Sequence, residues 1–501
     1  MVAFRSSNRL GIEVRTSRSN TAPSVTDIPL CEPLPETLDA EQAWLRLIDQ
    51  PHVLFLDSAV RDRERGAWSY VAADPYRFLT LPVDSPAPLI PLHDELRRWP
   101  ADFRPDLPPF SGGAAGVFSY ELGRSFERLP RTRFDEFGFP ALAIGFYDVV
   151  LAFDHLRRRG WIVSRGVPAE SPAQRRRRAE ERRDQFLSWL ERPAERVHGD
   201  SKWAKRPLAL SPLDLSPEQL APRFSVAGPS GLTSNFSREA YCRAVERSVE
   251  YVRAGDIFQV NLSQRLLYPA LDDAVSLYRR LRSRNPAPFA AYFDCGDFQI
   301  ASASPERFVQ VCDRRVEARP IKGTRRRSPS PEADLFTGDE LQASEKDRAE
   351  NVMIVDLLRN DLSLACQPDS VHVSQLCGLE VFEFVQHLVS VVRGVLREDA
   401  AHLDLISCAF PGGSITGAPK VRAMEIIAEL EPTARGPYCG SLGYLGFDGA
   451  LDLNILIRTI TAGRGWWQLP VGGGIVAQSD PRLEYEETWH KAAGLLRALE
   501  P

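Results

Sequence analysis

The sequence predicts a large α/β (α+β) protein. Its length and composition indicate a large globular chain, and the mixture of helical and strand periodicities indicates the class. The chain has 501 residues, more than one simple core holds, so two or more large regions are expected. A hydrophobic content of 43% and a charged content of 26% are ordinary for a globular enzyme. Apolar residues recur with the helical period of 3.6 in some stretches and with the strand period of 2 in others.

Charge, cysteine spacing and hydropathy exclude several functional classes. The net charge of -5 gives no reason to expect nucleic acid or an anionic membrane as a partner. The eight cysteines form no Cys-x-x-Cys pair and no zinc-type Cys/His cluster, so free thiols in a reducing cytoplasm are expected. Because no apolar run approaches about 18 residues, no transmembrane helix is predicted.

The polar, irregular stretch 1–30 predicts a disordered tail. Its arginines are not accompanied by a continuous apolar segment, so it is not a secretory signal; a basic transit peptide is the alternative. Folded sequence is expected from about Pro35. Residues 31–191 form an N-terminal region, and the Pro- and Ser-rich residues 192–234 a connecting segment.

In the N-terminal region the same periodicities place two helices and several strands. The helices are predicted at 40–48 and 174–190, and the strands at 53–57, 68–73, 117–120 and 161–164; residues 141–153 are predicted to be strand-rich. The second helix opens with four arginines, and Glu180 and Glu181 follow them. These charges partly balance, which favours a solvated helix face over a nucleic-acid patch.

Residues 235–501 form the second region, and its helices carry clear end signals. Ser237 is a predicted N-cap, Gly255 follows the end of the same helix, and Pro481 lies in the first turn of the last helix. The helices are predicted at 237–254, 273–284, 344–362, 418–430 and 480–499. Strands are predicted at 257–267, 289–293, 298–303, 309–311, 316–318, 440–446, 451–460 and 468–476, and a strand or a pair of strands at 384–395.

The basic stretch 318–327 is the first candidate for chemistry. Pro320 favours an extended Arg319, and Gly323 permits a turn, so Lys322 is expected on a loop. A neutral amine at that position can act as a nucleophile, and the arginines that follow favour the neutral form and attract anions. The alternative is an ordinary basic loop on a solvated face.

Two pairs of acidic residues are the second candidate. Asp347 and Glu350 lie three residues apart on one predicted helix, and Glu484 and Glu487 on another. Residues three apart share a helix face, so each pair projects two carboxylates together. Two facing pairs can hold Mg2+, which prefers oxygen ligands. The alternative is that each pair caps or solubilises its helix.

Seven stretches together resemble the chorismate-utilising enzymes, which include anthranilate, aminodeoxychorismate, isochorismate and salicylate synthases. They are GDIFQVNLSQR (255–265), SASPERF (302–308), RPIKGT (319–324), KDRAENVMIVDLLRND (346–361), QHLVS (386–390), GSITGAPK (413–420) and GGGIV (472–476). The resemblance covers residues 236–498 strongly and 35–165 more weakly. It implies a fold of two large antiparallel sheets in a sandwich with helices packed outside.

Two positions choose among the subfamilies. Isochorismate and salicylate synthases carry a lysine base where this chain has Gln259, and an amide cannot abstract the proton of water. Aminodeoxychorismate synthases typically carry lysine at the position of Lys322, whereas anthranilate synthases typically carry alanine. Residues 147–148 and 153–155 also resemble the aminodeoxychorismate synthases. The resemblance therefore implies chorismate amination at C4, for para-aminobenzoate and folate biosynthesis.

The resemblance also implies roles for individual residues. Lys322 attacks the substrate ring, Glu306 protonates the leaving hydroxyl, and His387 lies near the ring, unless it is a hydrogen-bonded core histidine. Glu350 and Glu487 bind Mg2+, and Asp347 and Glu484 lie next to these two ligands and orient them. The residues implied to hold the substrate carboxylates are Ser414, Tyr438, Arg458, Gly472, Gly473, Gly474 and Lys491.

The implied partners are a glutaminase and, at the N-terminal region, tryptophan. The sequence has no glutaminase nucleophile segment, so ammonia is expected from a separate subunit. Residues 55–58 resemble a tryptophan-binding stretch of feedback-inhibited anthranilate synthases, which makes Ser58 a candidate pocket residue; a purely structural pocket is equally compatible. Two alternative functions are anthranilate synthase component I and a catalytically inactive regulatory paralogue. Intact Lys322, Glu306, Glu350 and Glu487 argue against the inactive paralogue.

Overall fold

The computed structural model describes residues 29–60, 66–192, 221–328, 330–381 and 385–500. Residues 1–28 of the predicted tail 1–30, and residues 193–220 of the predicted connecting segment 192–234, lie outside the described residues. In the described part the strands form a 13-stranded sheet, called sheet A here, and a 10-stranded sheet, called sheet B. Their strand pairs are antiparallel, as the sequence resemblance predicts.

Both sheets combine strands from the two predicted regions. Sheet A has the order β1 (Leu30–Pro33), β8 (Arg159–Ser164), β7 (Val149–Asp154), β3 (Trp68–Ala72), β2 (Leu54–Asp57), β12 (Phe289–Asp294), β13 (Phe298–Ser304), β22 (Thr459–Gly463), β23 (Trp466–Ile475), β11 (Gln259–Pro269), β10 (Thr233–Ser234) and β9 (Phe224–Ser225), and β19 (Gly417–Ala418) pairs with β11. Sheet B has the order β16 (Ile321–Arg326), β18 (Val385–Val395), β15 (Arg315–Ala318), β14 (Arg307–Cys312), β21 (Leu451–Asn454), β20 (Ser441–Gly446), β5 (Gly113–Phe118), β6 (Leu142–Tyr147) and β4 (Arg77–Leu81), and β17 (His372–Val381) pairs with β18.

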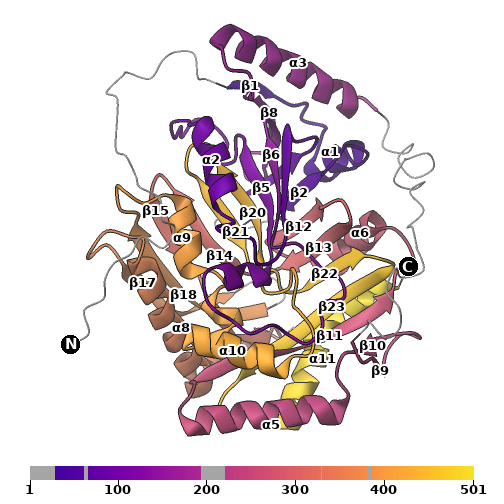
Figure 1. The fold of residues 1–501 in the computed structure, drawn as a ribbon, viewed down its shortest axis with the longest axis vertical. Helices are drawn as coiled ribbons and strands as arrows, with labels where there is room; N and C mark the ends of the chain where they lie inside the picture. The colour runs from indigo at the N-terminus through magenta and orange to yellow at the C-terminus, as the bar shows by residue number, and fades with distance from the viewer. Residues whose placement is uncertain (1–28, 61–65, 193–220, 329, 382–384, 501) are drawn as a thin grey trace.

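The sheets face each other across a shared apolar core, and helices cover the outside (Figure 1). Leu54 and Ile300 of sheet A pack in this core with Leu442 and Tyr444 of sheet B, all of them buried. The helices are α1 (Ala40–Arg46), α2 (Ile90–Arg98), α3 (Pro172–Leu190), α5 (Arg238–Ala254), α6 (Ala274–Arg284), α7 (Pro331–Ala343), α8 (Glu345–Ser363), α9 (His402–Ala409), α10 (Lys420–Leu430) and α11 (Pro481–Leu499), with 3₁₀ turns η2 (Tyr120–Ser125) and η5 (Gly413–Ile415).

Local signals place the helix ends correctly. The Ser237 hydroxyl accepts a hydrogen bond from the Ala240 amide, and Gly255 ends α5 with φ of 81°. On α3, Arg176 pairs with Glu180 at 2.7 Å on the solvent side, which confirms the predicted solvated face. Arg182 of the same helix instead turns inward and pairs with the buried Asp148 at 3.1 Å.

The predicted strand 451–460 is wrong, because it is two strands in different sheets, and the strand-rich stretch 141–153 divides in the same way. The stretch 141–153 breaks at Asp148, between β6 in sheet B and β7 in sheet A. The predicted strand 451–460 breaks between Asn454 and Thr459, where β21 in sheet B gives way to β22 in sheet A. Both halves of each stretch are apolar, so the pattern carries no interruption. The Asp148 turn is instead held by arginines of α3, which lie distant in sequence.

Several elements lie where the sequence predicts none, among them β1, β4, β9, β10, α2, α7, β17 and α9. Strand β1 begins at Leu30, so ordered chain starts before Pro35. A proline lies in the first turn of α2 and of α7, and the apolar residues of α7 do not gather on one face. Among the described residues, no helix combines the length and apolar composition that crossing a membrane requires. The eight cysteines are free thiols, as predicted.

Candidate active site

Lys322 lies on a strand, not on the predicted loop. It is the second residue of β16, at the edge of sheet B. The pairing of β16 with β18 is irregular between Lys322 and Thr324, where Gly323 adopts φ of 73°. A Cβ at Gly323 would lie 3.1 Å from the side chain of Asp347, so only glycine suits both the backbone conformation and the close approach of α8.

The amine of Lys322 meets groups from two other elements. Its Nζ lies 3.9 Å from Glu350 of α8 and 3.5 Å from the carbonyl oxygen of Ser414 in η5. The side chains of Lys322 and Glu350 are only 14% and 15% exposed. The predicted positive cluster around the lysine is largely neutralised, because Arg325 pairs with Asp347 at 3.2 Å and Arg319 pairs with Glu380 at 2.8 Å.

Glu306 lies beside Lys322, in the short segment where the chain crosses from β13 in sheet A to β14 in sheet B. Its carboxyl group is buried. Burial raises the pKa of Glu306 to about 7, although the Lys322 charge and hydrogen bonds from the Ser414 hydroxyl and the Ile321 amide oppose the rise. A carboxyl group with this pKa is available both as an acid and as a base near neutral pH.

The two predicted acidic pairs lie near the starts of α8 and α11, and their charges influence one another. Burial raises the pKa of Glu350; Lys322 and Lys346 oppose this, while Asp347 and Glu487 add to it. Burial also acts to raise the pKa of Glu487, but the neighbouring lysines outweigh it, and the result lies below the usual range. The strongest of these partners is Lys491, at 2.6 Å.

The same carboxylates supply oxygen atoms, the ligand type that Mg2+ prefers. A Cβ added to Gly473 would lie 3.4 Å from Glu484 Oε2 and 3.5 Å from Glu487 Oε1, so the missing side chain leaves space beside these oxygens. Glu484 is also held by the Ser479 hydroxyl at 2.7 Å. Among the described residues no group of three or more His, Cys, Asp or Glu side chains is assembled for a metal ion. Mg2+ needs only one or two carboxylates, because waters and substrate complete its octahedron.

The residues predicted to bind the substrate carboxylates lie near the C-terminal end of β23. Arg458 adopts φ of 53° in the segment that crosses from β21 to β22, and its guanidinium donates to the carbonyl oxygen of Lys491. Lys491 in turn donates to the carbonyl oxygen of Gly472 at 2.9 Å. Burial lowers the pKa of Arg458 and raises that of the buried Tyr438 well above its usual range. This set joins α11 to the glycine run 472–474.

Gln259 stands at the first position of β11, and its side chain faces the same glycine run. It is fully buried, and neither its amide oxygen nor its amide nitrogen has a hydrogen-bond partner among the described residues. A Cβ added to Gly474 would collide with the amide nitrogen. An amide therefore occupies this position of the site, and it offers no base.

His387 and Ser58 occupy different parts of the molecule. His387 lies on β18 opposite Thr324 of β16, so it is on the strand next to Lys322. The Ser58 hydroxyl donates to the carbonyl oxygen of Trp68 at 2.6 Å, and its amide donates to the Ser69 hydroxyl. These bonds hold the end of β2 to β3, remote in the fold from the Lys322 cluster.

Lys346 is a further charged residue beside the two acidic pairs, and it was not among the residues predicted from the sequence. Its charge acts on Glu350, Glu484 and Glu487. The signal was present, because Lys346 precedes Glu350 by four residues on one helix face.

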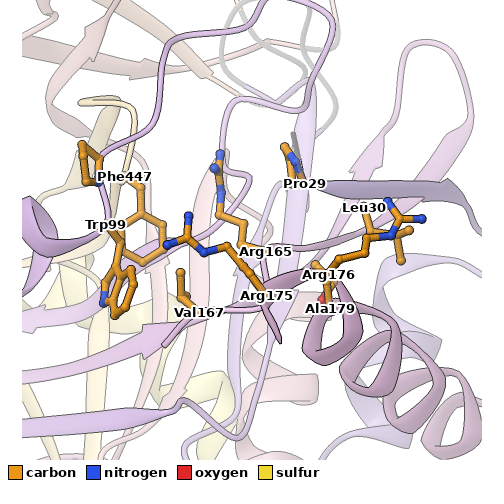
Figure 2. Close-up of a pocket in the computed structure, with 11 residues that line it drawn as sticks. Pro29, Leu30, Trp99, Arg165, Val167, Arg175, Arg176, Ala179 and Phe447 are labelled. Carbon is orange, nitrogen blue, oxygen red and sulfur yellow. The ribbon is translucent and has the colours of Figure 1, made fainter. Parts of the chain in front are cut away.

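A pocket elsewhere in the molecule does not belong to this cluster (Figure 2). It lies between α3, the end of α2 and the start of β1, and none of the predicted site residues lines it. Its arginines serve the fold: Arg165 donates to Ser111, and Arg175 lies 5.3 Å from the ring of Trp99.

The family model of chorismate-binding enzymes matches residues 62–497 of this chain. This chain belongs to the chorismate-binding enzymes. Anthranilate synthase component 1 from Thermus thermophilus is 40% identical over 468 residues, which cover 91% of this chain and 94% of that protein. Aminodeoxychorismate synthase component 1 from Klebsiella aerogenes is 38% identical over 479 residues, which cover 92% and 96%.

Solved structures agree with this membership. Anthranilate synthase component I from Streptococcus pneumoniae matches with a TM-score of 0.71 and 29% identity, over 87% of this chain and 94% of that one. A menaquinone-specific isochorismate synthase from Escherichia coli shares the fold, with a TM-score of 0.67 and 18% identity, over 94% of this chain and 96% of that one. The family and the fold predicted from the motifs are thus confirmed. The two sequence relatives are named for two different activities, anthranilate synthase and aminodeoxychorismate synthase.

Proposed function

We propose that this chorismate-binding enzyme is an aminodeoxychorismate synthase, which converts chorismate and ammonia to 4-amino-4-deoxychorismate and water, for para-aminobenzoate and folate biosynthesis. One observation carries the proposal: the amine of Lys322, on the edge strand of sheet B, reaches the same Ser414 turn as the buried acid Glu306. A nucleophile and an acid thus share one small site. Anthranilate synthases typically carry alanine at this position, which offers no nucleophile.

The chemistry proceeds in two substitutions. The neutral amine of Lys322 attacks C2 of the ring, the two conjugated double bonds shift, and the C4 hydroxyl leaves as water with a proton from Glu306. Ammonia then adds at C4, the double bonds shift back, and Lys322 leaves C2. The proton that the amine loses in the first step returns to it in the second. Splitting one difficult substitution into two covalent steps lowers each barrier.

The remaining residues bind and orient the substrate. Arg458, Lys491, Tyr438 and the backbone of the glycine run hold the two carboxylates of chorismate. Glu350 and Glu487 would hold Mg2+, with Asp347 and Glu484 behind them, and the bound ion would anchor the ring carboxylate. Gln259 supplies no base for water, which favours ammonia as the second nucleophile. The free thiols support a cytoplasmic location.

A product assay tests the proposal directly. The chain is incubated with chorismate, Mg2+ and ammonium, and the products are separated by chromatography. We expect 4-amino-4-deoxychorismate with little or no pyruvate, because the enolpyruvyl ether stays on the product. Anthranilate with stoichiometric pyruvate would instead establish the second candidate, anthranilate synthase component I, which the 40% identity to the Thermus thermophilus protein favours. If neither product forms, the chain is an inactive regulatory paralogue.

The metal proposal predicts a strong effect of Glu487→Gln. The substitution removes one negative charge from the acidic set, so Mg2+ affinity falls and the substrate carboxylate meets Glu350 without a counter-ion. We expect kcat/KM for chorismate to fall about 100-fold, partly restored by high Mg2+. Steady-state kinetics across a magnesium titration measures this. Full activity of the wild type in excess chelator would rule out the metal.

The ammonia source gives a separate prediction. The pure chain is expected to use high concentrations of ammonium and to use glutamine only after a glutaminase subunit is added. Product formation is compared with glutamine alone, ammonium alone, and glutamine plus the subunit. Glutamine-dependent turnover by the pure chain would mean that it contains its own amidotransferase site.

A further inference from the structure

Arg435 lies at the centre of a buried polar cluster behind the Ser414 turn. It follows α10, and its side chain is 2% exposed. Its guanidinium donates two parallel hydrogen bonds to Glu431, from Nε at 2.9 Å and from Nη2 at 2.6 Å. Glu431, 3% exposed, also accepts bonds from the amide and the hydroxyl of Ser263. Both charges are therefore compensated without water, which is the condition for keeping an ion pair in a core.

The remaining donors of Arg435 point at backbone that carries the active site. Its Nη1 donates to the carbonyl oxygen of Ile415 at 3.1 Å, and its Nη2 donates to that of Asn261 at 2.7 Å. Ile415 follows Ser414, whose carbonyl accepts from Lys322 and whose hydroxyl bonds Glu306. Asn261 pairs with Gly474 of the glycine run. One guanidinium thus joins the turn beneath the catalytic pair to the strand beside the substrate carboxylate site.

Aromatic rings fix the plane of the guanidinium. Its carbon lies 5.7 Å from the ring centre of Tyr438 and 4.7 Å from that of Tyr120 in η2. The backbone amide of Arg435 donates to Glu121 of η2 at 2.8 Å. The N-terminal region therefore supports one side of the cluster, and the predicted substrate residue Tyr438 packs on it.

We propose that Arg435, held by Glu431, is a positioning residue that sets the Ser414 turn relative to Lys322 and Glu306. It touches no substrate. It affects turnover because it holds the Ser414 carbonyl and hydroxyl in place, and it affects substrate binding because it packs against the Tyr438 ring. This inference rests on the proposed roles of Lys322 and Glu306. A planar fork is required, because a single ammonium cannot reach Glu431, Ile415 and Asn261 together.

Arg435→Lys tests the proposal, because it keeps the charge beside Glu431 and removes the fork. We expect kcat with ammonium to fall about 100-fold, the cost of a misplacement near 1 Å, while KM for chorismate changes only a few-fold. Arg265→Lys is the matched control. Arg265 and Glu136 form another buried ion pair, with side chains 7% and 1% exposed, away from the Ser414 turn. The control should lose melting temperature but keep kcat.

A pH profile separates positioning from general destabilisation. The wild-type kcat should fall as Glu306 ionises near pH 7. Glu306 faces Lys322, the Ser414 hydroxyl, the Ile321 amide and Cys439. The Ser414 bond lowers its pKa, so a displaced turn moves the descending limb of the Arg435→Lys profile to higher pH. If Arg435→Lys does not fold, Glu431→Gln replaces it as the test variant. This change weakens the same hydrogen-bonded fork and should move the descending limb in the same direction.

The outcomes are distinguishable. If folded Arg435→Lys or Glu431→Gln keeps the wild-type kcat and its descending limb lies at the wild-type pH, the positioning role is overturned. An equal loss of kcat in Arg265→Lys would also overturn it, because buried pairs would then act only through stability. A wild type without amination activity would instead overturn the proposed function.

Discussion

Lys322→Ala is expected to lower the rate of 4-amino-4-deoxychorismate formation by about 1000-fold or more, as loss of a covalent nucleophile does in other enzymes. The amine is the group on β16 that reaches both Glu350 and the Ser414 turn. Without it, ammonia must displace the C4 hydroxyl in one step. The methyl group of alanine fits the strand, so the fold should persist.

Intact-protein mass spectrometry measures the covalent step. With chorismate and Mg2+ but no ammonia, the wild type should gain mass on a peptide that contains Lys322. Lys322→Arg is the matched control, because it keeps the positive charge but stays protonated and cannot attack. It should be as inactive as the alanine variant and form no adduct. Absence of an adduct in an active wild type would keep the function and remove only the covalent route.

Glu306→Gln is expected to lower kcat by about 100- to 10000-fold, the usual contribution of a positioned general acid. The amide keeps the shape of the carboxyl group and cannot protonate the leaving hydroxyl. The sign of the pH dependence follows from the raised pKa of about 7. Glu306 is protonated and competent below this pH, so the wild-type kcat should fall as pH rises through it.

Measurement of kcat between pH 5.5 and 9 checks this prediction, at about half-unit intervals. The descending limb should be absent from the residual activity of Glu306→Gln. Glu95→Gln is the control, because Glu95 is also buried but pairs with Arg77 far from Lys322. Its profile should match the wild type. A limb that persists in Glu306→Gln would assign the acid role to another group.

Most of the candidate site could be predicted from sequence, because it consists of short segments with strong local rules. Asp347 and Glu350 share a helix face through spacing alone, as do Glu484 and Glu487. The N-cap Ser237, the glycine after α5 and Pro481 in the first turn of α11 are likewise local. Proximity of the segments was inferred from the family resemblance, and the structure places Lys322, Glu306 and Glu350 together.

By itself, the sequence determined the family, the ends of helices such as α5 and the acidic pairs, since motifs and spacing are properties of neighbouring residues. Tertiary structure decided the sheet changes near Asp148 and Arg458, because the partners that turn the chain come from distant elements. It also decided that Lys322 lies on a strand, since β18 supplies the backbone partners. The Arg435 cluster was invisible for the same reason: Glu431 is close in sequence, but Ile415, Asn261 and Tyr120 reach the guanidinium only in the folded chain.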